Sequence, residues 1–191
     1  FTRKYAVPEV TVAVSAAGAL TPAGLGGSCL VPLLRAGLID WMVMTGANLY
    51  HDLHFALGQR LHIGSPMIDD RELRADGVVR IYDIFLEAET LFAADAYSRE
   101  FCASLGDRGK IGSAEFHHLL GKKLLADKPE NKDYSVLMTA AELDVPLFTS
   151  SPGDSTLGMN MAETALGGAN IDFDVTLDVN LTAAIVHSAK K

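Results

Sequence analysis

Residues 40–52 constrain the fold of this chain more than any other stretch of its sequence. The stretch begins with a short apolar run, 41–44, which is followed by Thr45 and Gly46 and then by polar residues that open an amphipathic segment. A buried strand that ends in a small-residue loop and leads into a helix is typical of α/β proteins, in which ligands bind at the carboxyl ends of parallel strands. The sequence therefore predicts a ligand-binding loop at this place.

Two other stretches predict strands of the same kind. Residues 10–15 are rich in β-branched side chains, and residues 145–148 form a short apolar run interrupted by Pro146. Helices are predicted at residues 25–35, 49–57, 84–104, 113–126, 134–143 and 175–190, with Ser113 and Asp133 as N-caps. Pro32 is expected to kink the first helix or to shift its start.

The remaining segments are predicted to be irregular. They are residues 60–82, with one short helical turn, the loops at 16–24, 107–112 and 149–158, and a polar turn at 170–174. Strands that alternate with helices favour one α/β domain over residues 1–191, built on a Rossmann-like parallel sheet that is flanked by helices.

Composition excludes some partners. The net charge is -8, so no basic face is expected for nucleic acid, and no apolar run approaches the ~20 residues of a membrane span. The negative charge attracts cations such as polyamines or a basic protein surface, although it also serves solubility. Because Cys29 and Cys102 do not form a disulfide framework, a reducing, cytoplasmic location is expected.

Two histidines in the central stretch raise the question of a metal site. His51 and His54 share a helix face, but their spacing differs from that of a zinc protease helix and no third ligand is nearby, so no metal is expected. His51 and Asp52 are instead predicted to contact a substrate or cofactor. The alternative for Asp52 is stabilisation of its own helix through the macrodipole. His117 and His118 are predicted to lie on the surface.

The predicted loop at residues 149–158 carries hydroxyl groups and one carboxylate. Such a loop at a strand end can hold a ribose or a phosphate, with Asp154 accepting a hydrogen bond from a ribose hydroxyl. The alternative is an ordinary loop in which Asp154 caps a helix. Methionines near both loops are predicted to line the core or a pocket; they are Met42, Met44, Met159 and Met161.

Several colinear motifs resemble the deoxyhypusine synthase family, and the bacterial and archaeal deoxyhypusine synthase-like branch is the closest match. The motifs run over nearly the whole chain, at residues 17–24, 38–40, 45–52, 61–66, 77–83, 145–148 and 153–158. The resemblance implies a Rossmann-like fold, bound NAD, and a homotetramer with active sites between paired subunits. It also implies aminobutyl transfer from a polyamine such as spermidine to an acceptor amine, which is a protein lysine in hypusine formation or a small diamine.

The resemblance assigns roles to individual residues. The cofactor loops are Gly18, Ala19, Leu20, Thr21 and Pro22, then Thr45, Gly46 and Ala47, then Asp154; the substrate contacts are Asn48, Tyr50 and His51. Tyr50 and His51 stand where the eukaryotic enzymes carry two acidic residues, and Met159 stands where the family has an aspartate.

The family's nucleophilic lysine lies in a Trp-Gly-Lys motif downstream of everything matched here, so no catalytic residue is expected in this chain. The chain is expected to be the middle part of a longer enzyme or one chain of a multi-chain assembly, including a hetero-oligomer with a companion chain. The alternative function is a catalytically incomplete NAD-binding subunit that scaffolds or activates a homologous catalytic chain.

Overall fold

A three-stranded parallel sheet lies at the centre of the computed structural model, which describes residues 2–7 and 9–189 and describes Asp154 by its backbone only. The strand order is β1–β2–β7, and Val14 of β1 lies beside Met42 of β2. The strands are β1 (Ala13–Ala16), β2 (Trp41–Met44) and β7 (Leu147–Thr149). All three were predicted from their short apolar runs, so the α/β class and the parallel sheet are confirmed.

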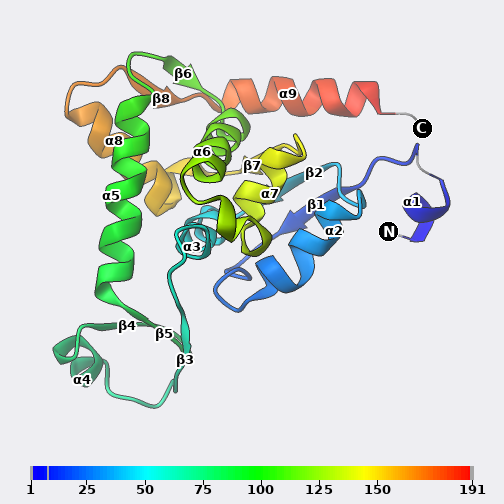
Figure 1. Ribbon diagram of the computed structural model, residues 1–191. Helices are drawn as coiled ribbons and strands as arrows, with labels where there is room; N and C mark the ends of the chain where they lie inside the picture. Colours follow the sequence, from blue (N-terminus) through cyan, green and yellow to red (C-terminus); the bar gives the residue numbers. More distant parts are fainter. Residues whose placement is uncertain (1, 8, 190–191) are drawn as a thin grey trace.

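Helices that include α3 and α7 pack around this sheet and supply much of the core, whereas α1 and α9 lie at the outside of the molecule (Figure 1). The helices other than the short one at residues 70–75 are α1 (Thr2–Ala6), the π-helix η1 (Gly26–Leu30), α2 (Val31–Arg35), α3 (Gly46–Ala56), α5 (Ala88–Ser104), α6 (Ser113–Asp127), the 3-10 helix η2 (Pro129–Tyr134), α7 (Val136–Glu142), the 3-10 helix η3 (Pro152–Asp154), α8 (Thr156–Leu166) and α9 (Val175–Ser188). Met42 and Met44 of β2 are fully buried against Leu49 and Leu53 of α3. The helix predicted over residues 25–35 begins as a π-helical turn and becomes α-helical only at Val31, with Pro32 in the first turn of α2. The start of the α-helix is therefore shifted to the residue before Pro32, as expected.

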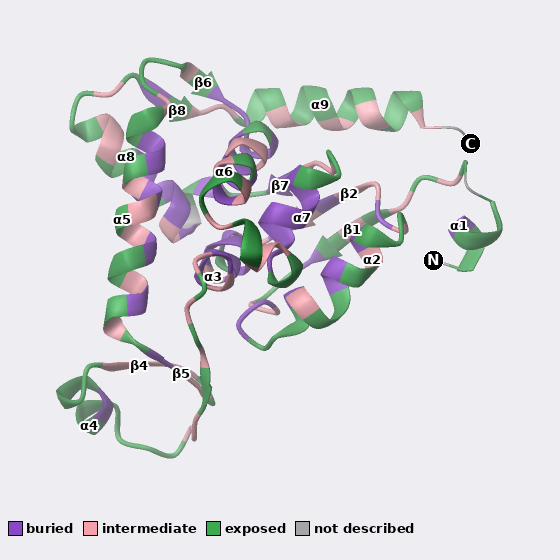
Figure 2. Cartoon of the chain, viewed as in Figure 1, coloured by how far each residue is buried: buried purple, intermediate pink, exposed green. Residues whose placement is uncertain are grey.

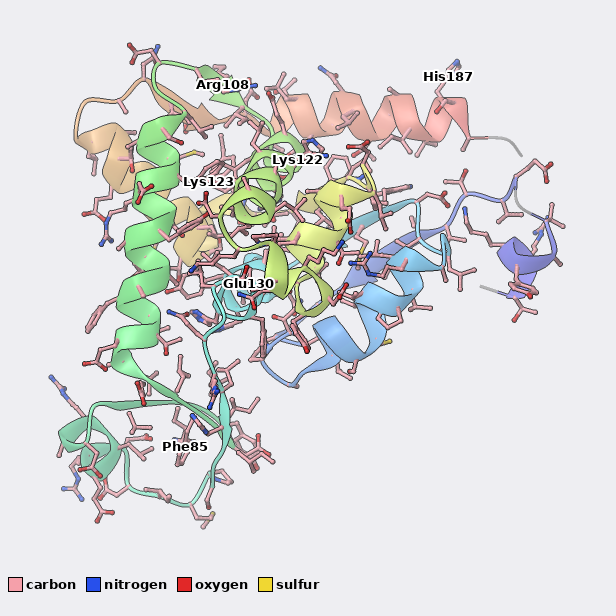
Figure 3. All side chains as sticks on the ribbon, viewed as in Figure 1. Phe85, Arg108, Lys122, Lys123, Glu130 and His187 are labelled. Atoms are coloured by element: carbon pink, nitrogen blue, oxygen red, sulfur yellow. The ribbon has the colours of Figure 1, made fainter. Side chains whose placement is uncertain are left out.

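A separate lobe, residues 60–87, projects from the end of α5 (Figure 1). It holds α4 (Asp70–Ala75) and an antiparallel sheet in the order β3–β5–β4, with β3 (His62–Ile63), β4 (Val78–Ile81) and β5 (Ile84–Glu87). Phe85 lies inside the lobe (Figure 3), and a Cβ atom at Gly64 would lie 2.2 Å from its ring. We name this segment the hairpin lobe.

The prediction of one helix over residues 84–104 was wrong at its start. Ile84–Glu87 is a strand, because Tyr82 adopts a left-handed backbone with φ 54° and turns the chain back on β4. The predicted irregular segments at 107–112 and 170–174 contain a parallel strand pair, β6 (Gly109–Ile111) with β8 (Ile171–Phe173). These strands are three residues long, too short to show a periodicity. Helix α8 was not predicted.

The predicted N-caps were also wrong. Helix α7 begins after Ser135, whose Oγ accepts a hydrogen bond from the Met138 N–H, while Asp133 lies in η2. The first N–H groups of α6 donate to the carboxylate of Asp178, which belongs to α9. Ser113 uses its hydroxyl elsewhere, to accept a hydrogen bond from the Thr149 N–H of β7 at 2.9 Å. A tertiary contact therefore caps α6, whereas α7 has a local cap at Ser135 instead of Asp133.

Within the described ranges, no helix combines the length and the apolar character needed to cross a membrane. Both cysteines are free, Cys29 being exposed and Cys102 buried.

Candidate functional site

The three loops that follow the parallel strands lie along one edge of the sheet. The strand order β1–β2–β7 places the β2–α3 junction between the loop at 17–25 and the loop at 150–155. The carboxyl edge of a parallel sheet is where open α/β folds bind ligands. The structure therefore brings the three predicted cofactor segments to one edge, with Thr45 and Gly46 at its middle.

The N-terminal turns of α3 and α8 meet at this edge. A Cβ atom added to Gly46 would lie 2.0 Å from the Cβ of Ser155, so a glycine is required at the closest approach. Ser155 caps α8, since its Oγ accepts a hydrogen bond from the Gly158 N–H. The positive ends of two helix dipoles and the free N–H groups of their first turns thus face the same space, which favours an anionic group.

Asn48 fixes the loop that follows β1. Its side-chain oxygen accepts hydrogen bonds from the N–H groups of Leu20 at 2.6 Å and Thr21 at 3.2 Å. Its side-chain nitrogen donates to the Ala16 carbonyl and to Thr45 Oγ1. Asn48 is fully buried, so its amide holds the loop in position and is not directed at a ligand. We call this set of hydrogen bonds the Asn48 bracket.

Thr21 and Pro22, two of the predicted cofactor residues, are buried. The Thr21 hydroxyl donates to the main-chain carbonyl of Asn48 at 2.6 Å, and Pro22 borders a cavity next to the hairpin lobe. Gly18 is exposed with φ 70°, and a Cβ atom there would meet nothing within 4 Å. The loop therefore offers its exposed backbone around Gly18, not the Thr21 side chain, to a ligand.

A cavity of about 250 Å³ lies beside the N-terminus of α3, and we call it the α3 cavity. Its walls come from α3, the hairpin lobe, α5 and the start of α8, and none of its lining side chains is charged. The lining residues are Ala47, Tyr50, His51, Val79, Ile81, Leu86, Leu91, Ser155 and Thr156. Three residues predicted to form the site, Ala47, Tyr50 and His51, thus meet in one mostly apolar cavity.

The two polar rings of this cavity differ in what they can offer a ligand. The Tyr50 hydroxyl donates to Asp95 Oδ1 at 2.8 Å, and burial together with that carboxylate raises the pKa of Tyr50. His51 Nδ1 is buried and has no hydrogen-bond partner among the described residues, and burial lowers the pKa of His51. His51 therefore brings a neutral imidazole to the wall of the cavity, which also includes the hydroxyl-bearing residues Ser155 and Thr156.

Asp52 does not reach the cavity. It is fully buried and accepts hydrogen bonds from the Ser135 hydroxyl and from the N–H groups of Val136 and Leu137, each at 2.7–2.8 Å. The prediction that Asp52 contacts a ligand is wrong, and so is the alternative that it stabilises its own helix. Burial raises the pKa of Asp52 to about 6, against the lowering effect of these hydrogen bonds.

The loop after β7 faces a second cavity, of about 370 Å³, which we call the β8 cavity. Ser150, Ser151 and Gly153 form one wall, and Asp172 of β8 and Val175 of α9 form the other. The side chain of Asp154 lies outside the described part of the chain. Among the described residues, no group of three histidine, cysteine, aspartate or glutamate side chains is placed to hold a metal ion.

Sequence reasoning did not assign the apolar walls of the α3 cavity. Val79 and Ile81 belong to the motif at residues 77–83, which resembles the family but did not predict a role for either residue. Leu86 was predicted to lie in a helix, whereas it lies in β5. Two short runs rich in β-branched and apolar residues, 78–81 and 84–86, with Tyr82 and Asp83 between them, were the available signal for a hairpin. The position of that hairpin against α3 depends on tertiary packing and has no local signal.

The fold and the site define an α/β protein with three strand-end loops at the carboxyl edge of its parallel sheet and the α3 cavity beside them. A sequence profile of the deoxyhypusine synthase family matches residues 2–191, and the chain belongs to this family. A deoxyhypusine synthase-like protein of Cyanothece sp. is 49% identical over 191 residues, which cover 99% of this chain and 48% of the relative. A Methanosarcina acetivorans relative named as a probable deoxyhypusine synthase 2 is 34% identical, over 96% of this chain and 52% of the relative.

A crystal structure shares the fold. It is that of an Entamoeba histolytica protein assigned as a deoxyhypusine synthase, with a TM-score of 0.69 and 14% sequence identity. The match covers 92% of this chain and 53% of that one. The chain therefore spans about half the length of the relatives that it matches.

Two buried histidines make the stability of the fold sensitive to acid. Burial lowers the pKa of His54 and of His117 to about 4, and His117, predicted at the surface, is 3% exposed. Between pH 6.5 and 4 the unfolded chain binds protons that the native chain excludes, so stability falls as the pH falls; Asp52, with a raised pKa, opposes this in part. Lowering the pH from 7.5 to 5 is expected to reduce the free energy of unfolding by on the order of 2 kcal/mol in urea titrations.

The variant His117→Gln should flatten this pH dependence, and His187→Gln should not, because His187 is exposed near the end of α9 (Figure 3). Equal stability of the unmodified chain at both pH values would contradict the neutral burial of these imidazoles.

Proposed function

We propose that this chain forms the NAD-binding part of an enzyme that transfers an aminobutyl group from a polyamine to an acceptor amine. The observation that carries the proposal is the meeting of the α3 and α8 N-termini, at Gly46 and Ser155, on the carboxyl edge of the parallel sheet. Membership of the deoxyhypusine synthase family supports the same reaction class.

The residues present at this edge fit a dinucleotide. The two helix N-termini offer a place for the pyrophosphate in a chain whose net charge of -8 is otherwise repulsive to anions. The small residues around Gly18 leave room for close approach of a ribose or phosphate. We assign Gly18, Thr45 and Ala47 to the cofactor, and Asp154 by its place in the loop. When bound, NAD would supply the hydride acceptor for oxidation of the polyamine.

The α3 cavity fits the carbon chain of the amine. Its walls of Val79, Ile81 and Leu86 exclude water from the alkyl segment, and Tyr50 presents its ring because its hydroxyl is held by Asp95. The neutral imidazole of His51 can form a hydrogen bond with one amine nitrogen of the substrate. The cavity carries no carboxylate, so we propose that it holds a weakly charged part of the substrate, where a dication would be poorly solvated.

A nucleophilic lysine for the transfer step is proposed to come from outside the matched residues. Lys4 is the buried lysine of the described residues, and its Nζ pairs with Asp40 at 2.5 Å. Lys110, Lys122 and Lys132 are exposed or half-exposed and also pair with carboxylates. Covalent capture of the butyl group needs an amine that is free to attack, and each of these four lysines is already engaged by a carboxylate. We further propose an oligomer, because family sites lie between subunits.

The test of the function compares the complete product of the natural gene with the 191-residue chain, each with NAD and spermidine. For the complete product we expect release of 1,3-diaminopropane, measured by chromatography, and a borohydride-trapped butyl adduct, measured by mass spectrometry. The 191-residue chain should bind NAD in calorimetry and form no adduct. NAD binding with neither product in the complete protein would instead identify the scaffolding subunit. Absence of NAD binding would overturn both functions.

The substitution His51→Ala is expected to raise the apparent KM for the polyamine roughly tenfold, because one buried hydrogen bond is worth about 1–2 kcal/mol. The affinity for NAD should stay unchanged, since His51 lines the α3 cavity and not the Gly18 loop. His187→Ala, at an exposed position, is the matched control. A loss of NAD affinity in His51→Ala would show that His51 contacts the cofactor and not the substrate.

A further inference from the structure

Helix α9 is apolar and yet poorly covered, being exposed or of intermediate burial along its length (Figure 2). None of its residues, all of which the structure describes, is buried. Ile185 is of intermediate burial, and the other large apolar side chains of the helix are exposed by 40–60%; they are Val175, Leu177, Val179, Leu181 and Val186. Asp178 and His187 are the only ionisable residues of the helix. A helix with this composition is normally covered on most sides, and a patch of this kind normally marks an interface.

The rest of the molecule holds α9 mainly by its first turns. The carboxylate of Asp178 accepts hydrogen bonds from the N–H groups of Ser113 and Ala114 at the start of α6. Leu177 lies against Gly112, where a Cβ atom would be 3.3 Å from the Leu177 Cβ. Beyond this anchor the helix runs along one side of the molecule (Figure 1). The anchor fixes the direction of α9 while leaving the side chains of its second half free.

Strand β8, which leads into α9, has an open edge. Within the described part of the chain β8 pairs with β6 alone, and this pairing is parallel. A helix that follows a strand of a parallel sheet normally crosses over to the next parallel strand of the same sheet. An unpaired strand edge is also a site for pairing with further polypeptide. The open edge and the uncovered helix therefore point to the same missing neighbour.

The β8 cavity lies along this strand, since Ile171, Asp172 and Phe173 all line it. Ser150 and Ser151 of the loop after β7 also line it. A parallel strand added beside β8 would lie next to this cavity, and its following loop would extend the row of strand-end loops. The added segment would thus contribute to the ligand crevice as well as to the core.

We propose that α9 and the open edge of β8 form the docking surface for a parallel strand and its loop. The occupant is polypeptide of the same family, from the part of its members that this chain does not span. The family members are about twice as long as the matched region, with 48% and 53% of two relatives covered. The proposal requires family membership alone and does not depend on NAD binding or on a polyamine.

The experiment measures the accessibility of α9 by thiol labelling. Val179→Cys and Val186→Cys, both at positions that are 60% exposed here, are made separately in a Cys29→Ser background. Arg71→Cys is the control, since its side chain is 91% exposed on the hairpin lobe, far from α9 (Figure 1). Maleimide labelling rates are measured in the complete product of the natural gene and in the 191-residue chain, over a hundredfold range of protein concentration.

In the complete product, the Val179→Cys and Val186→Cys thiols are expected to react at least tenfold more slowly than the Arg71→Cys thiol at every concentration. In the 191-residue chain the three thiols should react at similar rates. Labelling of α9 at the control rate in the complete product would overturn the proposal. Protection that disappears on dilution would also overturn it, because a second copy of the chain would then be the occupant.

Discussion

Replacing Asp52 with alanine is expected to lower the free energy of unfolding by about 3 kcal/mol, because buried donors would lose their acceptor. The Ser135 hydroxyl and the N–H groups of Val136 and Leu137 all donate to this carboxylate at the N-terminus of α7. Asp52 is fully buried, so water cannot replace the lost oxygens without disturbing the core. Urea unfolding followed by circular dichroism measures the change.

Asp133→Ala is the matched control for this prediction. Asp133 is the residue that the sequence suggests as the cap of the same helix, yet it is 66% exposed and pairs with Arg35 on the surface. Its loss should cost less than about 1 kcal/mol. Asp52→Asn should fall between the two, since an amide keeps one acceptor oxygen. If Asp133→Ala destabilised the chain more than Asp52→Ala, the cap would lie at Asp133 after all.

Gly46→Ala is expected to be the most damaging single-methyl change at the crevice. Its Cβ would lie 2.0 Å from the Ser155 Cβ, so the N-terminal turns of α3 and α8 would have to separate. Overpacking of this kind costs about 1–3 kcal/mol of stability. Because we place the NAD pyrophosphate at these turns, we also expect NAD affinity to fall by about tenfold or more, measured by calorimetry on folded protein.

Gly153→Ala is the comparison for this change. Gly153 lies in the loop that precedes Ser155, but a Cβ atom there would meet nothing within 4 Å. Its replacement should leave stability and NAD affinity nearly unchanged. The double variant Gly46→Ala with Ser155→Gly should regain part of the lost stability, because the clashing Cβ is removed. Equal behaviour of Gly46→Ala and Gly153→Ala would show that α3 and α8 do not meet closely.

The parallel strands and the family were accessible from the sequence because their signals are local. The runs at 41–44 and 145–148 are apolar and end in loops of small or polar residues, which is enough to predict a buried strand and its binding edge. The strands β3, β4, β5, β6 and β8 were missed, since segments of two to four residues do not show a period of two. Their pairing is settled by contacts between distant segments.

The roles of polar side chains were the least predictable part. Asn48 and Asp52 stand in a stretch that faces the ligand edge, and both were expected to touch a ligand. The turn of α3 points them inward, where the amide of Asn48 meets Leu20 and the carboxylate of Asp52 meets Val136. His51, which stands between them in the sequence, lines the α3 cavity, and its contact with a substrate stays a prediction. Whether a polar side chain of α3 faces the core or the cavity depends on its position around the helix and on the helices packed against it. Neither can be predicted from the residue type.

The Asn48 bracket has a consequence for the thermodynamics of ligand capture. Because the loop after β1 is tied to α3 by Asn48, Thr21 and Thr45, its conformational freedom is lost when the chain folds, not when a ligand arrives. Binding should then show little ordering entropy and a backbone that barely moves between the free and bound states. The variant Asn48→Ala would remove these hydrogen bonds, and the loop would then lose its conformational entropy when the ligand binds.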